Sequence, residues 1–454
     1  MSVYKPCDIR GPVGALSGDL YRSWGRALGQ KLPPGSRFVV GGDVRLSTPG
    51  FLEALVTGLS EAGMVVENLG VVPTPLVYFA KRHRGAGGAA IVTASHSPPD
   101  LNGLKWLIGE LPPTAEHVRQ LEREGEGEAG ATRSAGTVRR VDVATEYLNW
   151  LLERWGCQRG GKLRRVIVDP GNGCWSGRAR DDLGRVFPAL ELVTIHDTED
   201  GTFSERNPDC ARPEYLEALS EAVRREGAQL GVAFDGDGDR VAFVDGDGVM
   251  STAEQTTWIL LRSFGEELEG RAVVHDIKFS DLIPRTTNEL GGHAVAERSG
   301  HAYLRTRMIG SGALFGAEIS GHYFYGELDG GDDGLFTACR MIAHLARSGT
   351  SLTALRKSCP IVYLTPEIRA TADDREATLR EIRDAYRDYP RTTVDGIRVD
   401  FPRGWVLVRR SVTEDRALTL RFEGQTAADL ERIVGDFRGK FPGLVPEDGE
   451  DGSG

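Results

Sequence analysis

Short apolar runs alternate with longer amphipathic segments along most of this 454-residue chain. Residues 38–40, 89–92 and 166–168 are strand-length apolar runs, and helix-length segments such as 49–62 and 215–227 accompany them. This alternation is typical of βαβ units with mainly parallel sheets. We therefore expect an α/β fold in which three related mixed α/β domains each repeat this alternation of strands and helices.

The chain is longer than the roughly 250–300 residues that one hydrophobic core organises, so several domains are expected. Its composition changes after Pro360, where residues 368–389 predict a strand followed by a charged helix and residues 406–408 predict a further strand. We expect this last section to form a smaller α+β C-terminal domain.

The formal net charge of -11 argues against a nucleic acid or an anionic membrane as the main partner, because those surfaces attract basic proteins. The six cysteines show no C-x-x-C spacing, so neither a disulfide framework nor a zinc site is predicted, which fits a cytoplasmic protein. Charged residues precede any apolar run, and no stretch of about 18 apolar residues marks a membrane span, so we expect neither a signal peptide nor a membrane helix.

A hydroxyl-rich loop at residues 93–105 follows a run typical of a buried strand and reads T-A-S-H-S-P-P-D-L-N-G-L-K. Pro98 and Pro99 prevent the chain from continuing as a regular strand or helix, so the loop is stiff. Ser95 would lie at the carboxyl end of a strand, where α/β sheets bind their ligands. We expect Ser95 to be the reactive side chain of this loop.

Three aspartates recur at every second position in residues 235–240, which read D-G-D-G-D-R. Alternate positions of an extended chain face one side, so the three carboxylates would converge. Such hard oxygen ligands suit Mg²⁺, and Arg240 beside them would bind a phosphate group bidentately. An EF-hand is excluded because its sixth position would be Arg240 and its twelfth Gly246. A solvated acidic turn is the other interpretation.

Two further segments carry polar side chains suited to a phosphosugar. In residues 316–322, Glu318, Ser320 and His322 alternate and suit sugar hydroxyls, although an edge strand with a polar face would show the same alternation. Residues 409–414 read R-R-S-V-T-E and follow an expected strand. Their guanidiniums and hydroxyls would grip a dianionic phosphate, with a solvated basic turn as the alternative.

Together, these four segments resemble the α-D-phosphohexomutase family, and within it the bacterial phosphomannomutase/phosphoglucomutase branch. They look like the family's phosphoserine, metal, sugar-recognition and C-terminal phosphate loops, in the family's order. Smaller matches include D-I-R-G at residues 8–11, D-V-R-L-S at residues 43–47 and G-G-D-D-G at residues 330–334. Val412 and Asp415 depart from the usual residues of the phosphate loop.

The resemblance implies four domains around one cleft. These are a phosphoserine domain (1–142), a metal-binding domain (143–250), a sugar-recognition domain (251–362) and a C-terminal phosphate-binding domain (363–454). It implies an intramolecular phosphotransferase that interconverts the 1-phosphate and the 6-phosphate of mannose, glucose or both. The implied cofactors are one Mg²⁺ per chain and hexose 1,6-bisphosphate as intermediate and activator. The partner is a hexose phosphate, with no nucleic acid or membrane, and the chain would be a monomer or a dimer.

The matched motifs also imply the site residues. The expected catalytic residues are Ser95, Lys105, His322, Arg10 and Arg240. The expected metal ligands are Ser95, Asp235, Asp237 and Asp239. The expected substrate-binding residues are Lys278, His301, Glu318, Ser320, His322, Arg409, Ser411 and Thr413.

Lys105 and His322 are the candidate general acid and base, and Lys105 would need a pKa depressed by Arg10 or Arg240 to act as a base. His96 is a poorer candidate, because adjacent residues of an extended chain point apart. The alternatives are a phosphoglucosamine mutase, a phosphatase and a catalytically silent sugar-phosphate-binding protein. In the mutase, the C-terminal domain is expected to close on the phosphate that is not being transferred.

Overall fold

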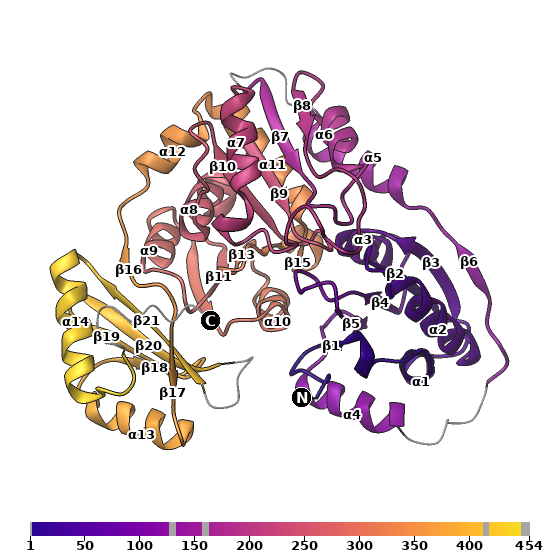
Figure 1. Cartoon of the computed structure of the whole chain (residues 1–454), viewed down its shortest axis with the longest axis horizontal. Coiled ribbons are helices and arrows are strands. Elements are labelled where there is room, and N and C mark those ends of the chain that lie inside the picture. Colours follow the sequence, from indigo (N-terminus) through magenta and orange to yellow (C-terminus); the bar gives the residue numbers. More distant parts are fainter. Residues whose placement is uncertain (1, 127–132, 157–162, 412–416, 446–454) are drawn as a thin grey trace.

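The computed structural model describes residues 2–126, 133–156, 163–411 and 417–445. Four sheets follow one another along the chain, and they form an arch with the N-terminal and C-terminal sheets at opposite ends (Figure 1). This is the multidomain α/β fold that the alternating pattern predicts. Within the described ranges, no helix is long and apolar enough to cross a membrane.

The first sheet is mixed and has the order β1-β5-β4-β2-β3-β6. Its strands are β1 (Ile9–Pro12), β2 (Arg37–Gly42), β3 (Val65–Val71), β4 (Gly88–Val92), β5 (Leu101–Ile108) and β6 (Val138–Arg140). Its helices are α1 (Gly18–Gln30), α2 (Thr48–Glu61), α3 (Thr74–His83) and α4 (Ala115–Glu126). The parallel pair β2 and β4 is almost wholly buried, as the apolar runs predict. Antiparallel pairing of β1 with β5 sets Arg10 opposite Gly103, close to Lys105.

The second sheet has the order β10-β9-β7-β8, with only β10 antiparallel to its neighbour. Its strands are β7 (Arg165–Asp169), β8 (Glu191–Thr194), β9 (Leu230–Phe234) and β10 (Val241–Asp245). The accompanying helices are α5 (Ala144–Trp155), α6 (Ala179–Val186) and α7 (Glu217–Arg225).

The third sheet has the order β12-β11-β13-β14-β15. Its strands are β11 (Ala272–Asp276), β12 (His293–Glu297), β13 (Phe315–Ala317), β14 (Tyr323–Tyr325) and β15 (Gly331–Asp332). Its helices are α8 (Ala253–Ser263), α9 (Leu282–Glu289), α10 (His301–Ser311), α11 (Gly334–Ser348) and α12 (Leu352–Ser358). A capping box between Thr252 and Gln255 fixes the start of α8.

The fourth sheet is antiparallel, with the order β16-β21-β20-β19-β18 and with β17 also paired to β21. Its strands are β16 (Tyr363–Leu364), β17 (Ile368–Thr371), β18 (Arg391–Thr392), β19 (Ile397–Phe401), β20 (Gly404–Arg410) and β21 (Ala417–Gly424). Its helices are α13 (Arg375–Ala385) and α14 (Ala427–Lys440). Short 3-10 helices elsewhere in the chain are η1 (Val13–Ala15), η2 (Pro213–Tyr215), η3 (Gly265–Leu268) and η4 (Gly326–Leu328).

The apolar core divides the chain unevenly. One cluster of buried side chains runs from Val39 to Leu352 and joins the first three sheets. The first sheet also has a core of its own, which includes Trp24 and Leu55, and so does the fourth, whose core includes Tyr386 and Phe422. A small cluster around Trp405 joins this last sheet to the third. The C-terminal unit is therefore attached through much less apolar surface than the other three share.

Candidate functional site

The serine loop begins directly after β4, which ends at Val92. Ser95 is 1% exposed and adopts a left-handed backbone conformation with φ 54°. This conformation is uncommon for a residue with a side chain, and it persists only where the surroundings impose it. Here the Ser95 amide donates to Thr93 Oγ1 at 2.8 Å. The hydroxyl is therefore fixed at the end of the strand.

Arg45 is fully buried and binds the serine loop through its backbone carbonyl groups. Its guanidinium donates to the carbonyl oxygens of Ser95 at 2.9 Å, Ser97 at 2.6 Å and Leu101 at 3.0 Å. Asp43 compensates the buried charge by accepting from Arg45 Nε at 2.9 Å. The basic turn at residues 43–47 matches the family in sequence, but the match assigned it no role. In the structure, Arg45 is a positioning residue for Ser95.

The Ser95 hydroxyl faces the aspartate segment of the next sheet. Oγ donates to Asp235 Oδ2 at 3.0 Å and lies 3.3 Å from Nδ1 of His96. The expectation that Ser95 and His96 point apart is wrong, because the chain is not extended at Ser95. Burial, followed by the charges of Arg240 and Arg10, lowers the pKa of His96 well below its usual value, so the ring is neutral.

The aspartate segment forms a turn between β9 and β10, so the expected extended segment is wrong. The prediction that the carboxylates converge is nevertheless correct. Asp235, Asp237 and Asp239 are buried, and each offers an oxygen within 4.8 Å of the others. A turn thus gathers the same three side chains that an extended strand would have aligned.

Glycines at two positions let this turn approach the serine loop. Gly238 has φ 79°, a conformation that residues with a side chain rarely adopt. At Gly236, an added Cβ would lie 2.7 Å from the carbonyl oxygen of Ser95. A side chain at position 236 would therefore push the serine and aspartate loops apart.

The buried carboxylates fit a divalent cation. Within the described residues, Oδ1 of Asp237 is buried and has no hydrogen-bond partner, and buried Oδ1 of Asp239 has only the ion pair with His322 at 3.3 Å. Such oxygens are costly unless a cation binds them, and a donor set made only of oxygen suits a hard ion such as Mg²⁺. Burial, together with the charges of Asp239 and Asp237, raises the pKa of Asp235 well above its usual value. A cation at this position would relieve that repulsion.

Lys105 on β5 reaches the same carboxylates. Its Nζ donates to Asp237 Oδ2 at 2.8 Å and to Asp239 Oδ2 at 2.7 Å. Burial favours the neutral amine, but the two carboxylates outweigh it and raise the pKa of Lys105 well above its usual value. The expectation of a pKa depressed by Arg10 or Arg240 is therefore wrong. Lys105 is an ammonium group here.

Two arginines flank the loops, at the positions that the motifs predict. Arg10 pairs with Asp8 at 2.8 Å, and its Nη1 donates to Ser97 Oγ at 3.4 Å. Arg240 is buried, and its Nε lies 3.8 Å from Asp235 Oδ2. Both guanidiniums are placed to meet an anionic group carried by the serine loop.

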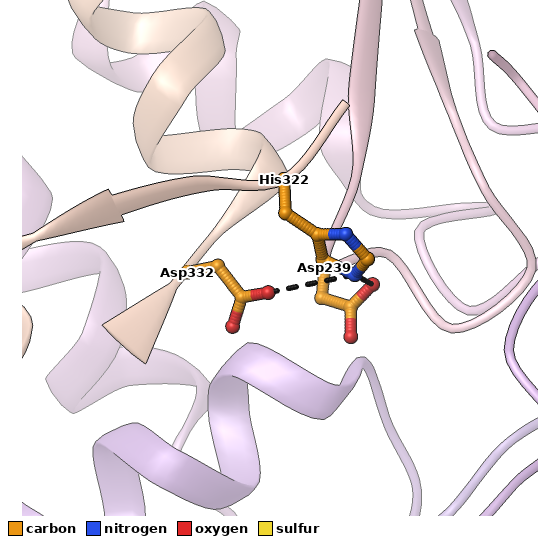
Figure 2. A group of neighbouring side chains, drawn as sticks. All are labelled: Asp239, His322 and Asp332. Atoms are coloured by element: carbon orange, nitrogen blue, oxygen red, sulfur yellow. Dashed lines mark ion pairs between the residues drawn. The ribbon is translucent and has the colours of Figure 1, made fainter. Parts of the chain in front are cut away.

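His322 lies between carboxylates from two elements (Figure 2). Its Nε2 is 3.3 Å from Asp239 Oδ1 and 3.6 Å from Asp332 Oδ2. Burial and the Arg240 charge oppose protonation, but the carboxylates of Asp239 and Glu318 prevail and raise the pKa of His322 to about 10. The ring is therefore an imidazolium that can donate a proton.

Asp332 belongs to the site although no sequence signal assigned it a role. Its Oδ1 lies 3.0 Å from Nε2 of His301, and its Oδ2 faces His322, so one buried carboxylate orients both rings. Pairing of β14 with β15, which sets Phe324 opposite Asp332, brings this carboxylate to His322. Only the strand register reveals this contact, since ten residues separate the two in sequence.

The sugar-recognition segment is a tight turn between β13 and β14, not an edge strand. The Glu318 amide donates to the His322 carbonyl at 3.0 Å, and Gly321 has φ 91°. Ser320 Oγ lies 2.9 Å from Nδ1 of His322. Burial acts against ionisation, but contact with His322 lowers the pKa of Glu318 to about 2. The turn thus presents a carboxylate and a hydroxyl beside an imidazolium.

Lys278 follows β11 at the junction of the third and fourth sheets. Its Nζ lies 3.8 Å from Asp276 and 3.6 Å from Glu367. Arg421 of β21 donates to the Lys278 carbonyl at 2.7 Å. Lys278 therefore sits where the C-terminal unit meets the rest of the chain.

The described residues of the predicted phosphate loop, Arg409 to Ser411, lie apart from the Ser95 cluster. Arg409 is 5% exposed, and its Nε donates to Asp395 Oδ2 at 2.6 Å. Arg409 and Ser411 line a cavity of about 560 Å³, and none of the described residues in its wall belongs to the group around Ser95. β20 extends to Arg410, two residues beyond the predicted strand end. Outside the described residues lie Val412, Thr413 and Asp415.

Family models match the chain in four consecutive parts. The phosphoglucomutase/phosphomannomutase α/β/α domain I model matches residues 3–128, and the domain II model matches residues 145–248. The domain III model matches residues 252–363, and the C-terminal domain model matches residues 367–440.

Several proteins are similar over almost their whole length. The phosphomannomutase/phosphoglucomutase of Pseudomonas aeruginosa is 33% identical, over 97% of this chain and 95% of the relative. The phosphoglucomutase of Neisseria meningitidis is 33% identical, over 96% of each. A solved structure of a phosphoglucomutase/phosphomannomutase family protein from Burkholderia thailandensis has a TM-score of 0.88, with 32% identity and 98% of both chains covered.

Proposed function

The chain belongs to the α-D-phosphohexomutase family, in its bacterial branch, and on that premise we propose that its hexose phosphate mutase activity proceeds through phosphorylated Ser95. The enzyme is an intramolecular phosphotransferase. One observation carries the proposal: Ser95 Oγ lies 3.0 Å from a carboxylate oxygen of the buried aspartate cluster. A phosphoryl group on Ser95 Oγ would contact the cation that the aspartates of this cluster are suited to bind.

In the proposed reaction, the phosphoryl group moves from Ser95 Oγ to the free hydroxyl of a hexose monophosphate. The bond between phosphorus and Oγ breaks, a bond to the sugar oxygen forms, and the hydroxyl proton leaves to a base. After the bisphosphate turns over, Oγ takes the other phosphoryl group and the second monophosphate is released. Mg²⁺ held by Asp235, Asp237 and Asp239 would neutralise charge on the transferring group.

We propose Lys105 and His322 as the groups that exchange the proton. Both lie against the aspartate cluster, and the raised pKa of each favours its protonated form. They are therefore suited to protonate a leaving oxygen, and the conjugate base of either can then accept the proton of the attacking hydroxyl. Arg10 and Arg240 would hold the phosphoryl oxygens during transfer.

Substrate binding is proposed to use two separate surfaces. Glu318 and Ser320, with the nearby His301, would bind the sugar hydroxyls. Arg409, Ser411 and Thr413 would hold the phosphate that is not transferred, and Lys278 is a further proposed substrate-binding residue. The separate core of the C-terminal unit supports a closing movement that brings the two surfaces together.

The preferred sugar is proposed to be glucose, mannose or both. Relatives of the chain are named phosphomannomutase/phosphoglucomutase, and Ile319 stands where the glucosamine branch commonly has glutamine. Assays of glucose, mannose and glucosamine 1-phosphates side by side test this choice. A glucosamine 1-phosphate kcat/KM above the other two would favour the phosphoglucosamine mutase alternative.

The phosphoserine is tested by Ser95→Ala, with Ser220→Ala on α7 as a matched control that lies outside the site. Ser95→Ala should lose mutase activity and the mass of one phosphoryl group, whereas Ser220→Ala should retain both. Near wild-type turnover of Ser95→Ala would refute the scheme. In the wild-type protein, release of inorganic phosphate without sugar isomerisation would favour the phosphatase alternative, and absence of both reactions would favour a silent binding protein.

Further proposals concern the cofactors and the cellular context. The activator is proposed to be hexose 1,6-bisphosphate, because the reaction regenerates it as an intermediate.

The ranges that the family models match support the domain boundaries at residues 142, 250 and 362. The cytoplasmic location and the monomeric or dimeric state stay predictions.

A further inference from the structure

The cavity of about 560 Å³ that contains Arg409 and Ser411 is strongly basic. Its wall is built from helix α13, from the ends of β19 and β20, and from Pro6 and Arg298 of distant parts of the chain. Among the described residues, the wall carries six arginines and two carboxylates: Arg298, Arg375, Arg380, Arg383, Arg409 and Arg410, with Glu376 and Asp395. This excess stands out in a chain whose formal net charge is -11.

The two carboxylates compensate two of these arginines. Arg409 pairs with Asp395 at 2.6 Å, and Arg410 pairs with Glu376 at 2.9 Å. Arg298, by contrast, lies over the ring of Tyr303, with its guanidinium carbon 4.2 Å from the ring centre. Arg383 also lies 3.7 Å from Asp384, which is not one of the wall residues. Among its described residues, the wall still has more guanidiniums than carboxylates, and such a surface attracts anions.

Arg380 and Arg383 share one face of α13, because side chains three residues apart are neighbours on a helix. Both are exposed and both line the cavity. Like charges at this spacing repel and weaken the helix unless an anion lies between them. An anionic ligand in the cavity would remove that repulsion.

We propose that Arg380 and Arg383, together with Arg298, form a second anion subsite that retains hexose 1,6-bisphosphate while it turns over. This inference rests on the proposed function, which needs the bisphosphate to reorient without leaving. Arg409 and Ser411 are the clamp that the family resemblance implies, whereas Arg298 and the α13 arginines lie outside that motif. The monophosphate needs one clamp, but the turning bisphosphate carries two dianionic groups and must withdraw one of them from the carboxylate-rich Ser95 cluster.

The subsite is tested with the double variant Arg380→Gln/Arg383→Gln. Arg387→Gln is the matched control, because Arg387 is exposed just beyond α13 and does not line the cavity. The readout is the concentration of added glucose 1,6-bisphosphate that gives half-maximal mutase activity, since an enzyme that loses its intermediate needs more of it. At low ionic strength the double variant should need about tenfold more, as expected when local electrostatic attraction is removed.

The difference should shrink as salt is raised, because exposed charges are screened over about 10 Å at 0.1 M. Arg387→Gln should match the wild type throughout. An unchanged bisphosphate requirement in the double variant would overturn the subsite.

A binding measurement separates this inference from the proposed mechanism. Calorimetric titration of glucose 1,6-bisphosphate into the Ser95→Ala protein should give a higher Kd when Arg380 and Arg383 are also replaced, and an equal Kd would overturn the subsite. Intact mass of the wild-type enzyme reports on the mechanism alone. If Ser95 carries phosphate and both Kd values agree, the mechanism stands and the subsite fails; if Ser95 never carries phosphate, the proposed mechanism fails first.

Discussion

Gly236→Ala is expected to uncouple the serine loop from the aspartate turn. The added Cβ would lie 2.7 Å from the Ser95 carbonyl oxygen, 3.1 Å from Pro208 Cβ and 3.3 Å from the ring of Phe203. The nearest of these atoms belongs to the backbone, so no side-chain rotation relieves the clash. The two loops themselves must separate.

The size of that separation follows from the contact distance. Ordinary van der Waals contact begins at 3.4 Å, so a Cβ placed at 2.7 Å requires a movement of 0.7 Å. A misplacement of about 1 Å between reacting groups costs on the order of a hundredfold in rate, so we expect kcat to fall between about tenfold and a hundredfold. Overpacking of this kind also destabilises a protein by about 1–3 kcal/mol.

Steady-state kinetics and thermal unfolding measure the two effects, with the kinetics recorded well below the unfolding temperature. Gly50→Ala in α2 is the control, because a Cβ there meets no atom within 4 Å. Alanine is also favoured over glycine by about 1 kcal/mol inside a helix, so this control should keep its activity and should not lower the Tm. A kcat for Gly236→Ala within twofold of the wild type would refute the idea that glycine sets the distance between the loops.

Three further changes give separate expectations. Asp332→Asn removes the charge that faces His301 and His322, so kcat should fall about tenfold with a smaller change in KM, and an unaltered kcat would contradict the orienting role. Arg45→Ala leaves a buried carboxylate unpaired and should lower the free energy of unfolding by about 3–5 kcal/mol in denaturant titrations, and a loss below 1 kcal/mol would argue against it. Burial lowers the pKa of His275 to about 4 from 6.5, so stability is full above pH 6.5 and declines as pH falls toward 4. His275→Gln should flatten the dependence of Tm on pH in that window.

Much of the site follows from the order of elements along the chain. The serine loop follows β4 and the aspartate turn follows β9, and both strands read in the sequence as short buried runs. Because α/β sheets bind ligands at the carboxyl ends of their strands, each loop was predictable as a ligand-binding loop of its own sheet. That Ser95 and Asp235 share one site was implied by the family resemblance, since β4 and β9 belong to different sheets. The fold class was predictable because short apolar runs alternate with amphipathic segments along the chain.

Local geometry was less accessible, because it depends on single backbone angles and on strand register. The φ of 54° at Ser95 reverses the expected relation to His96, and no residue pattern in T-A-S-H encodes that angle. Nearby arginines were expected to lower the pKa of Lys105. The pairing of β5 with its neighbours instead places the ammonium group against Asp237 and Asp239. The charge of a side chain follows from its residue type, whereas the charges of its neighbours in space depend on packing.

The apolar cluster that runs from Val39 to Leu352 has a thermodynamic consequence. Because three sheets share it, none of them can unfold without exposing surface that stabilises the other two, so they form one cooperative unit. The C-terminal unit joins the others through only the small cluster around Trp405, so it can melt on its own. Calorimetry should therefore resolve a large and a small heat-absorption peak. A ligand held only near Ser95 would move the large peak alone, whereas one that also reaches Arg409 would merge the two.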